Sequence, residues 1–136
     1  MVKISAQYLG EKRVQLTHAP SGRELQTDAP RDNNGRGESF SPTDLVAAGL
    51  ASCALTVMAI AAEKEGLSLE GASAEVIKHM TSQPRRISQL DLRIRLPHGL
   101  SVSDRQRLEN IARTCPVAES LPAHVEVKMH FDDNIS

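Results

Sequence analysis

Short stretches of alternating apolar and polar residues open the chain. Residues 2–9, 13–19 and 23–29 have the composition of strands, and Gly10 and Pro20-Ser21-Gly22 stand between them as turn signals. We therefore expect three short strands. The next stretch, residues 30–39, combines glycine, proline, asparagine and charged residues, which predicts a mobile surface loop of a length that often carries function.

A long helix is predicted directly after this loop. Ser41 is a suitable N-cap, Pro42 suits the first helical position, and Asp44 completes a capping box. Residues 45–62 contain no charge, and Glu-Lys-Glu-Gly at 63–66 ends the helix. A helix that is apolar on all sides is typical of one buried on every side. Since a chain of 136 residues is short for wrapping such a helix, we expect a second copy to cover it in an extensive homodimer.

The same uncharged stretch reaches the lower length limit of a membrane span. More than half of it is Ala, Gly, Ser, Thr or Cys, which insert weakly into a bilayer, so we expect no membrane association. The N-terminal residues show no long apolar stretch and no secretory cleavage pattern, which favours a cytoplasmic location.

The second half of the chain predicts further strands and a second helix. Residues 71–80 and 87–96 form a hairpin around Ser82-Gln83-Pro84, and residues 124–131 form a closing strand. Between them, Ser101 and Asp104 begin an amphipathic helix whose apolar stripe ends at Cys115, and Cys115-Pro116 begins a new helical turn. The expected fold class is α+β, one domain over residues 1–136, with a mostly antiparallel sheet around two core helices.

Composition excludes several classes of function. Lys plus Arg number 16 and Asp plus Glu 17, so the chain lacks the positive charge that nucleic-acid binding requires. Aromatic residues are only 2%, too few for base-stacking platforms. The histidines and the two cysteines show no metal-ligand spacing, so we expect no metal and no cofactor.

Cys53 and Cys115 are the candidate chemical groups. Each is placed on an inward face of a predicted helix, and a buried cysteine is often no more than a small apolar residue. The alternative is a thiol pair that cycles between dithiol and disulfide. Such a pair needs an ionised thiol, which free N–H groups would favour at Cys115 and which Arg31 or Arg36 of the loop would favour at Cys53.

The segment SFSPTDLVAAGLASCALTVM, together with TCPVAESL, resembles the OsmC/Ohr family of thiol peroxidases. Pro42, Cys53, Cys115 and Pro116 match its pattern, and the order of strands and helices agrees over nearly the whole chain. The resemblance implies an intertwined homodimer with two sites at the subunit interface, organic hydroperoxides as substrates and a lipoyl-type dithiol as reductant. It also implies that Cys53 is the peroxidatic thiol and Cys115 the resolving thiol.

One position departs from the family pattern. The family has a Glu ten residues before the peroxidatic cysteine, where it positions an arginine, and this chain has Thr43 there. A threonine cannot form a charge-assisted pair with a guanidinium. Asp44 is adjacent, but its register favours capping; Glu38 is nearby, and Arg13 is a third candidate for the cation. The alternative function is therefore an OsmC-like module that binds a small apolar ligand and has lost efficient catalysis.

Overall fold

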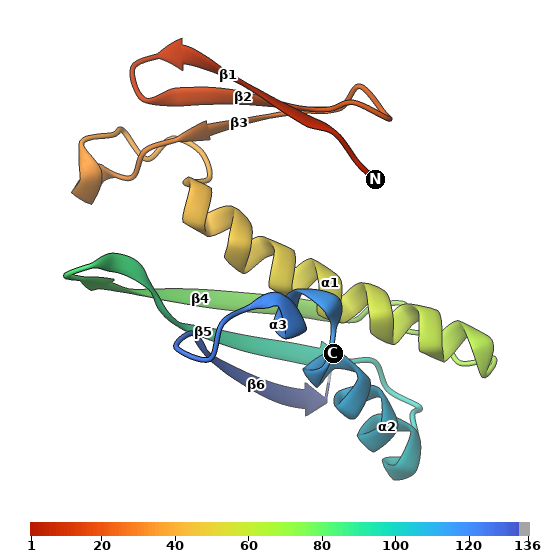
Figure 1. Ribbon diagram of the computed structural model, residues 1–136. Helices are drawn as coiled ribbons and strands as arrows, with labels where there is room; N and C mark the ends of the chain where they lie inside the picture. The colour runs from red at the N-terminus through yellow and green to blue at the C-terminus, as the bar shows by residue number, and fades with distance from the viewer. Residues whose placement is uncertain (134–136) are drawn as a thin grey trace. The chain divides into compact units, whose positions relative to one another are not determined.

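The computed structural model describes residues 1–133, which divide into two compact units, Met1–Val46 and Ala47 onward (Figure 1). The N-terminal unit contains an antiparallel sheet of β1 (Ile4–Gly10), β2 (Arg13–His18) and β3 (Glu24–Asp28) in that order. The three predicted strands are thus confirmed with slightly different ends. A division into compact units does not test the prediction of a single domain, which stays a prediction.

The predicted loop at residues 30–39 has internal structure. It contains a short 3₁₀ turn, η1 (Arg31–Asn33), and its backbone closes through the bonds from Gly35 N–H to Pro30 O and from Gly37 N–H to Ala29 O, both 3.0 Å. A Cβ atom at Gly35 would lie 1.8 Å from the Ala29 carbonyl oxygen, so this close approach requires glycine. The loop therefore presents its arginines from a hydrogen-bonded backbone.

Helix α1 (Pro42–Lys64) begins and ends as the sequence predicts. The Ser41 hydroxyl accepts the Asp44 N–H at 3.1 Å, and the Asp44 carboxylate accepts the Ser41 N–H at 2.8 Å, which is a capping box. At the other end, Gly66 has φ +70° and the Leu67 N–H bonds to the Ala62 carbonyl at 2.9 Å. These local interactions fix the helix that carries Cys53.

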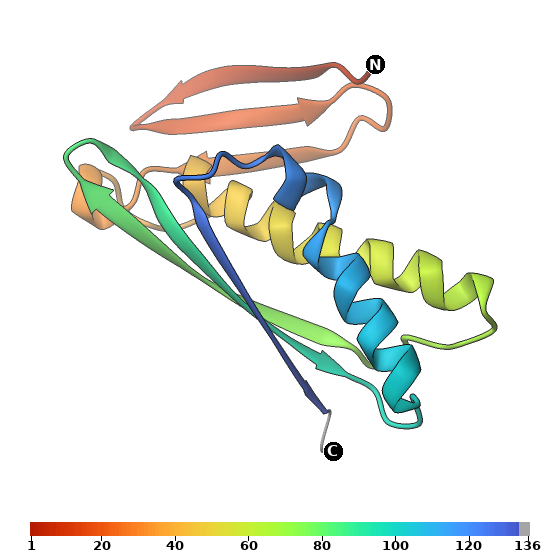
Figure 2. The same ribbon diagram turned by 60° about the horizontal axis from the view of Figure 1, so that its bottom comes forward.

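The C-terminal unit packs its helices on one face of a second sheet (Figures 1 and 2). The sheet has the order β4 (Ser73–Ser82), β5 (Arg85–Leu96), β6 (Glu126–Asp133), and the connection from β5 to β6 passes through α2 (Val102–Arg113) and α3 (Pro116–Ser120). Strands β4 and β5 form the predicted hairpin, with a cis peptide bond at Gln83-Pro84. Strands β5 and β6 run parallel. The sequence analysis did not give this direction, which follows from the helical crossover between the two strands.

The aliphatic core lies between this sheet and the helices. Alternate residues of β5, one stripe of α1 and two residues of α2 have no exposed surface. These residues are Leu50, Ala54, Met58, Ala62, Leu90, Leu92, Ile94, Leu96, Leu108 and Ala112. Cys115 belongs to the same buried set at 0% exposure, so the predicted stripe of α2 does lead to a buried cysteine.

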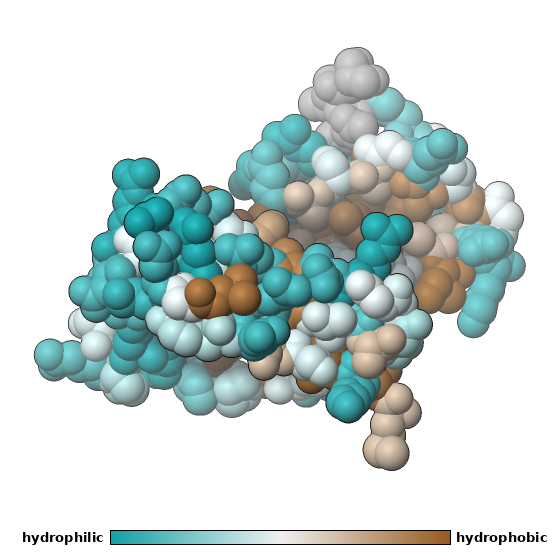
Figure 3. Space-filling view, turned by 90° about the horizontal axis from the view of Figure 1, so that it is seen from above, coloured by the Kyte–Doolittle hydropathy of each residue, from teal (hydrophilic) through white to brown (hydrophobic). Residues whose placement is uncertain are grey.

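Each unit also leaves apolar surface uncovered. One face of the N-terminal sheet gathers Ile4, Ala6, Tyr8, Val14, Leu16 and Leu25, and Ile4 and Tyr8 are 64% and 65% exposed. In α1, only 28% of the most apolar 18-residue window is buried, and Ile60 is half exposed. Brown apolar residues reach the surface between polar ones in Figure 3. By length and composition α1 also meets the criteria for a membrane span, which is weak evidence for a single helix.

Candidate functional site

The two cysteines meet inside the C-terminal unit. Cys53 lies in the middle of α1 and is partly exposed, whereas Cys115 is the N-cap residue of α3 and is fully buried. The Cys53 thiol is close enough to hydrogen-bond to the Cys115 thiol, and both are free. Residues 62 positions apart are thus neighbours, as the hypothesis of a thiol pair requires.

The surroundings of Cys115 favour its protonated form. Burial raises the pKa of the Cys115 thiol, and the neighbouring Cys53 thiol raises it further. The backbone N–H groups of Ala118 and Val117 act in the opposite direction but do not outweigh burial. The predicted N–H groups do favour a Cys115 thiolate, but burial has the larger effect and the pKa of this thiol is raised. A buried thiol is a poor first nucleophile, because the thiolate is the reactive form.

The position of the family Glu is occupied by a locally bonded side chain. The Thr43 and Ser41 hydroxyl oxygens lie 3.3 Å apart, within the first turn of α1. Asp44, the adjacent acid, caps the helix as its register predicts. Thr43 has no carboxylate to offer a guanidinium, and the Asp44 carboxylate accepts the Ser41 N–H, so the carboxylate groups to consider are those beside the candidate arginines themselves.

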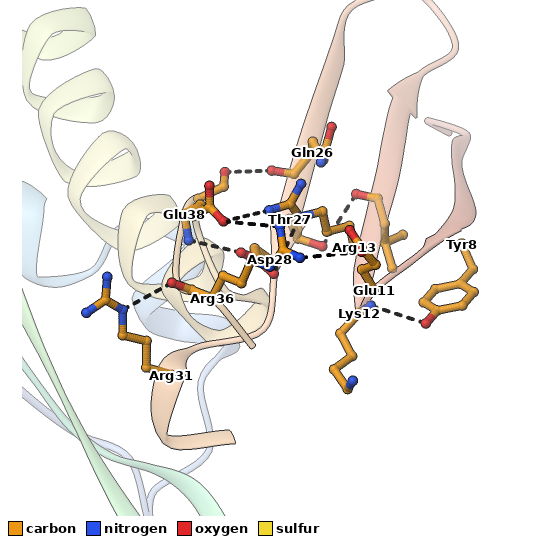
Figure 4. Close-up of polar contacts among 12 residues, drawn as sticks. Tyr8, Glu11, Lys12, Arg13, Gln26, Thr27, Asp28, Arg31, Arg36 and Glu38 are labelled. Carbon is orange, nitrogen blue, oxygen red and sulfur yellow. Dashed lines mark hydrogen bonds and ion pairs between the residues drawn. The ribbon is translucent and has the colours of Figure 1, made fainter. Parts of the chain in front are cut away.

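The loop arginines belong to the N-terminal unit and differ in their partners (Figure 4). The Arg31 Nε donates to the Arg36 carbonyl oxygen at 3.2 Å, and within residues 1–133 no carboxylate is paired with Arg31. The Arg36 guanidinium lies 3.4 Å from a Glu11 carboxylate oxygen and 3.9 Å from one of Glu38, and its side chain is 61% exposed. Arg31 therefore has an anchored guanidinium with an unneutralised charge, whereas the Arg36 charge is shared with two acids.

Arg13 is the most strongly held of the three arginines. Its Nη2 lies 2.9 Å from a Glu38 carboxylate oxygen, and its Nε lies 3.9 Å from Asp28 Oδ1. Asp28 is 1% exposed; its Oδ2 accepts the Glu38 N–H at 3.0 Å, and its Oδ1 has no hydrogen-bond partner in the described structure. Glu38 and Asp28 thus give Arg13 the carboxylate support that Thr43 cannot give. Figure 4 shows the three side chains converging.

The sequence analysis did not single out Asp28. A signal was present, because Arg13 and Asp28 are directly opposite each other when β2 and β3 pair around the turn at residues 20–22. Opposite charges at such cross-strand positions stabilise a sheet. Pairing the predicted strands residue by residue identifies this acid.

In the described part of the chain, no group of three His, Cys, Asp or Glu side chains is placed to bind a metal ion. Two adjacent free thiols, one buried and one partly exposed, can in general be oxidised reversibly to a disulfide.

Comparison with known proteins identifies the family. The OsmC-like protein family matches residues 35–130, and the chain belongs to this family. A solved structure from Psychrobacter arcticus 273-4, described as an osmotic stress induced and detoxification response protein, is 40% identical with a TM-score of 0.92, each chain being covered to 96%. A comparison with curated proteins finds no match.

More distant structures share the fold. The organic hydroperoxide resistance protein OsmC of Legionella pneumophila is 24% identical with a TM-score of 0.71, over 97% of this chain and 96% of that one. An organic hydroperoxide resistance protein of Vibrio cholerae, with captopril bound in one of its active sites, is 19% identical with a TM-score of 0.72, over 96% of this chain and 91% of that one. The fold resemblance stated from the sequence is thereby confirmed.

Proposed function

We propose that the protein is a thiol-dependent peroxidase that reduces organic hydroperoxides. The observation that carries the proposal is the adjacency of an accessible thiol, Cys53, and a buried one, Cys115, in a member of the OsmC-like family. Relatives named for organic hydroperoxide resistance support the substrate class. The reaction proposed requires no metal and no cofactor.

The proposed reaction has three steps. The Cys53 thiolate attacks the outer oxygen of the hydroperoxide, the O–O bond breaks, and protonation of the leaving alkoxide gives an alcohol and a Cys53 sulfenic acid. The Cys115 sulfur then attacks the sulfenic sulfur, which releases water and forms the Cys53–Cys115 disulfide. A lipoyl-type dithiol reduces this disulfide by two exchange steps, restores both thiols and leaves as its own cyclic disulfide. Because the thiols are adjacent, the second step competes well with over-oxidation of the sulfenic acid.

A cation near the Cys53 thiolate completes the proposal. Of the two loop arginines, Arg31 suits this role better than Arg36, because its Nε is anchored on the Arg36 carbonyl while its charge has no carboxylate partner among residues 1–133. Arg36 would then contribute only its backbone carbonyl group, which holds the Arg31 side chain in place. Arg13 is the alternative, and its support by Glu38 and buried Asp28 favours it.

Three matched substitutions distinguish these arginines. We expect Arg31→Gln to slow the reaction of Cys53 with iodoacetamide at pH 7 about three- to tenfold, because a thiol that loses a neighbouring positive charge ionises less readily. Arg36→Gln should leave the rate within about twofold. Cys115 is an internal reference, since burial and its raised pKa make it slow in every variant. If only Arg13→Gln slows Cys53, the cation is Arg13 and the assignment to Arg31 is wrong.

Substrate preference tests the function itself. With dihydrolipoamide as reductant, we expect consumption of cumene hydroperoxide with a kcat/KM at least about tenfold above that for hydrogen peroxide. The reason is that Cys53 lies in the uncharged, largely aliphatic stretch of α1, which favours an apolar substrate. Absence of turnover with either peroxide, under several dithiols, would contradict the proposed function.

A second function is favoured by Thr43 and by the captopril bound to the relative from Vibrio cholerae. In this alternative the protein is a binding module for a small apolar ligand, with weak or no peroxidase activity. One measurement separates the two functions. A peroxidase converts its two free thiols into one intramolecular disulfide after one equivalent of hydroperoxide, whereas a binding module keeps both thiols.

We propose further that the protein acts as a homodimer in the reducing cytoplasm. The uncovered apolar face of the N-terminal sheet and the uncovered sides of α1 support the dimer. Free cysteines support a reducing compartment. Because the net charge is close to zero, the proposal includes no nucleic-acid partner.

A further inference from the structure

A hollow of about 360 Å³ lies in the C-terminal unit beside α3. The side chains that line it are apolar except for Arg113, and include Leu121, Pro122, Val127 and Met129. Val127 and Met129 belong to β6, where they are in register with buried Leu90 and Leu92, so this side of the hollow continues the core face of the sheet. A volume near 360 Å³ is at the lower end of the range for small-molecule sites.

The rim of the hollow is held in place by hydrogen bonds. The segment Pro122–Val125 forms a turn closed by the bond from the Val125 N–H to the Pro122 carbonyl, 3.0 Å long. Arg86 of β5 donates to the His124 carbonyl at 3.3 Å, which ties this turn to the sheet. A site formed in this way needs little rearrangement to accept a ligand, and preorganisation of this kind favours affinity.

Arg113 gives the hollow one charged side. Its guanidinium carbon lies 5.1 Å from the centre of the Phe131 ring, so a cation–π contact orients the group. In the described part of the chain, no carboxylate is paired with Arg113. Three other arginines of this unit, Arg93, Arg105 and Arg107, lie beside acids instead. An oriented guanidinium with unused donors can take a carboxylate in a two-bond geometry.

We propose that this hollow is a binding site for an aliphatic carboxylate, whose chain lies on the apolar lining and whose carboxylate pairs with Arg113. The apolar side chains of the hollow would contact the aliphatic part of this ligand, and the Arg113 guanidinium would pair with its carboxylate group. The site is separate from the thiol pair, although Ala118, whose N–H contacts the Cys115 sulfur, also lines the hollow. The proposal does not depend on peroxidase activity.

Titration with octanoate tests the site, read by calorimetry and by amide NMR shifts of the full-length protein. We expect amide shifts centred on residues 121–129. We also expect 1-octanol, which has the same aliphatic chain without the charge, to bind with a dissociation constant about tenfold or more higher than that of octanoate. Arg113→Gln should weaken octanoate by a similar factor, while Arg113→Lys, which keeps the charge, loses less. Arg95→Gln, at an exposed position on the opposite face of β5, is the matched control and should not change binding.

Each result decides the proposal. Equal binding of octanoate and octanol to the unaltered protein overturns the role of Arg113 without any substitution. Shifts centred outside the hollow, or no binding at all because another copy of the chain covers it, overturn the site. If peroxidase activity is absent but octanoate binds with the stated dependence on Arg113, the proposed site stands and the proposed function fails.

Discussion

Cys53→Ser is expected to abolish peroxide turnover, lowering kcat by on the order of a thousandfold or more. The proposed reaction has one atom that attacks the O–O bond, and a serine hydroxyl is neither ionised at neutral pH nor able to form the sulfenic acid. The adjacent Cys115 cannot replace it, because this thiol is fully buried and its pKa is raised. The measurement is steady-state consumption of cumene hydroperoxide with dihydrolipoamide.

Cys115→Ser gives a different expected result that separates the two roles. Without the second thiol, one hydroperoxide should be reduced per chain, and the product should be a Cys53 sulfenic acid that dimedone traps and mass spectrometry detects. Ser52→Ala is the matched control, since Ser52 is an exposed neighbour of Cys53 in α1 and should leave turnover unchanged. Sustained turnover by Cys53→Ser would show that the peroxidatic residue has been assigned wrongly.

Local features of this fold were predictable because they depend on residues close in the sequence. The capping box of Ser41 and Asp44 needs four consecutive positions, and the cap of α2 by Ser101 is of the same kind, with its hydroxyl accepting the Asp104 N–H at 3.1 Å. The direction of β6 was not predictable in this way. It depends on how the chain crosses from β5 through two helices, and the alternation of β6 is the same in a parallel or an antiparallel pair.

The candidate site shows the same division. That Cys115 is buried follows from its place at the end of the apolar stripe of α2, and its contact with Cys53 is consistent with the family pattern. The direction of the Cys115 pKa shift could not be predicted, because burial raises the pKa and N–H donors lower it. Only the packed structure determines which effect is larger. The support of Arg13 by Asp28 and Glu38 depends on strand register and a loop contact, over separations of up to 25 positions.

Ile60→Glu is expected to dissociate the proposed homodimer, raising its dissociation constant about a hundredfold or more. Ile60 is 50% exposed on α1, a helix whose most apolar window is largely unburied within one chain. A second copy that covers this helix would bury the new carboxylate without a partner, which costs several kcal/mol in each subunit. Sedimentation equilibrium over a range of concentrations measures the change.

The chain offers a closely matched control for this substitution. Ile77 is 61% exposed on β4 and lies beside charged residues such as Glu75 and Arg93, so Ile77→Glu adds the same charge to a surface that is already polar. We expect it to leave the dimer intact. Equal dissociation by both variants would mean that net charge, and not burial of α1, controls association. If the unaltered protein is a folded monomer at micromolar concentration, the proposed dimer is wrong. The apolar side of α1 would then be exposed to water, and soluble monomers rarely expose large apolar patches.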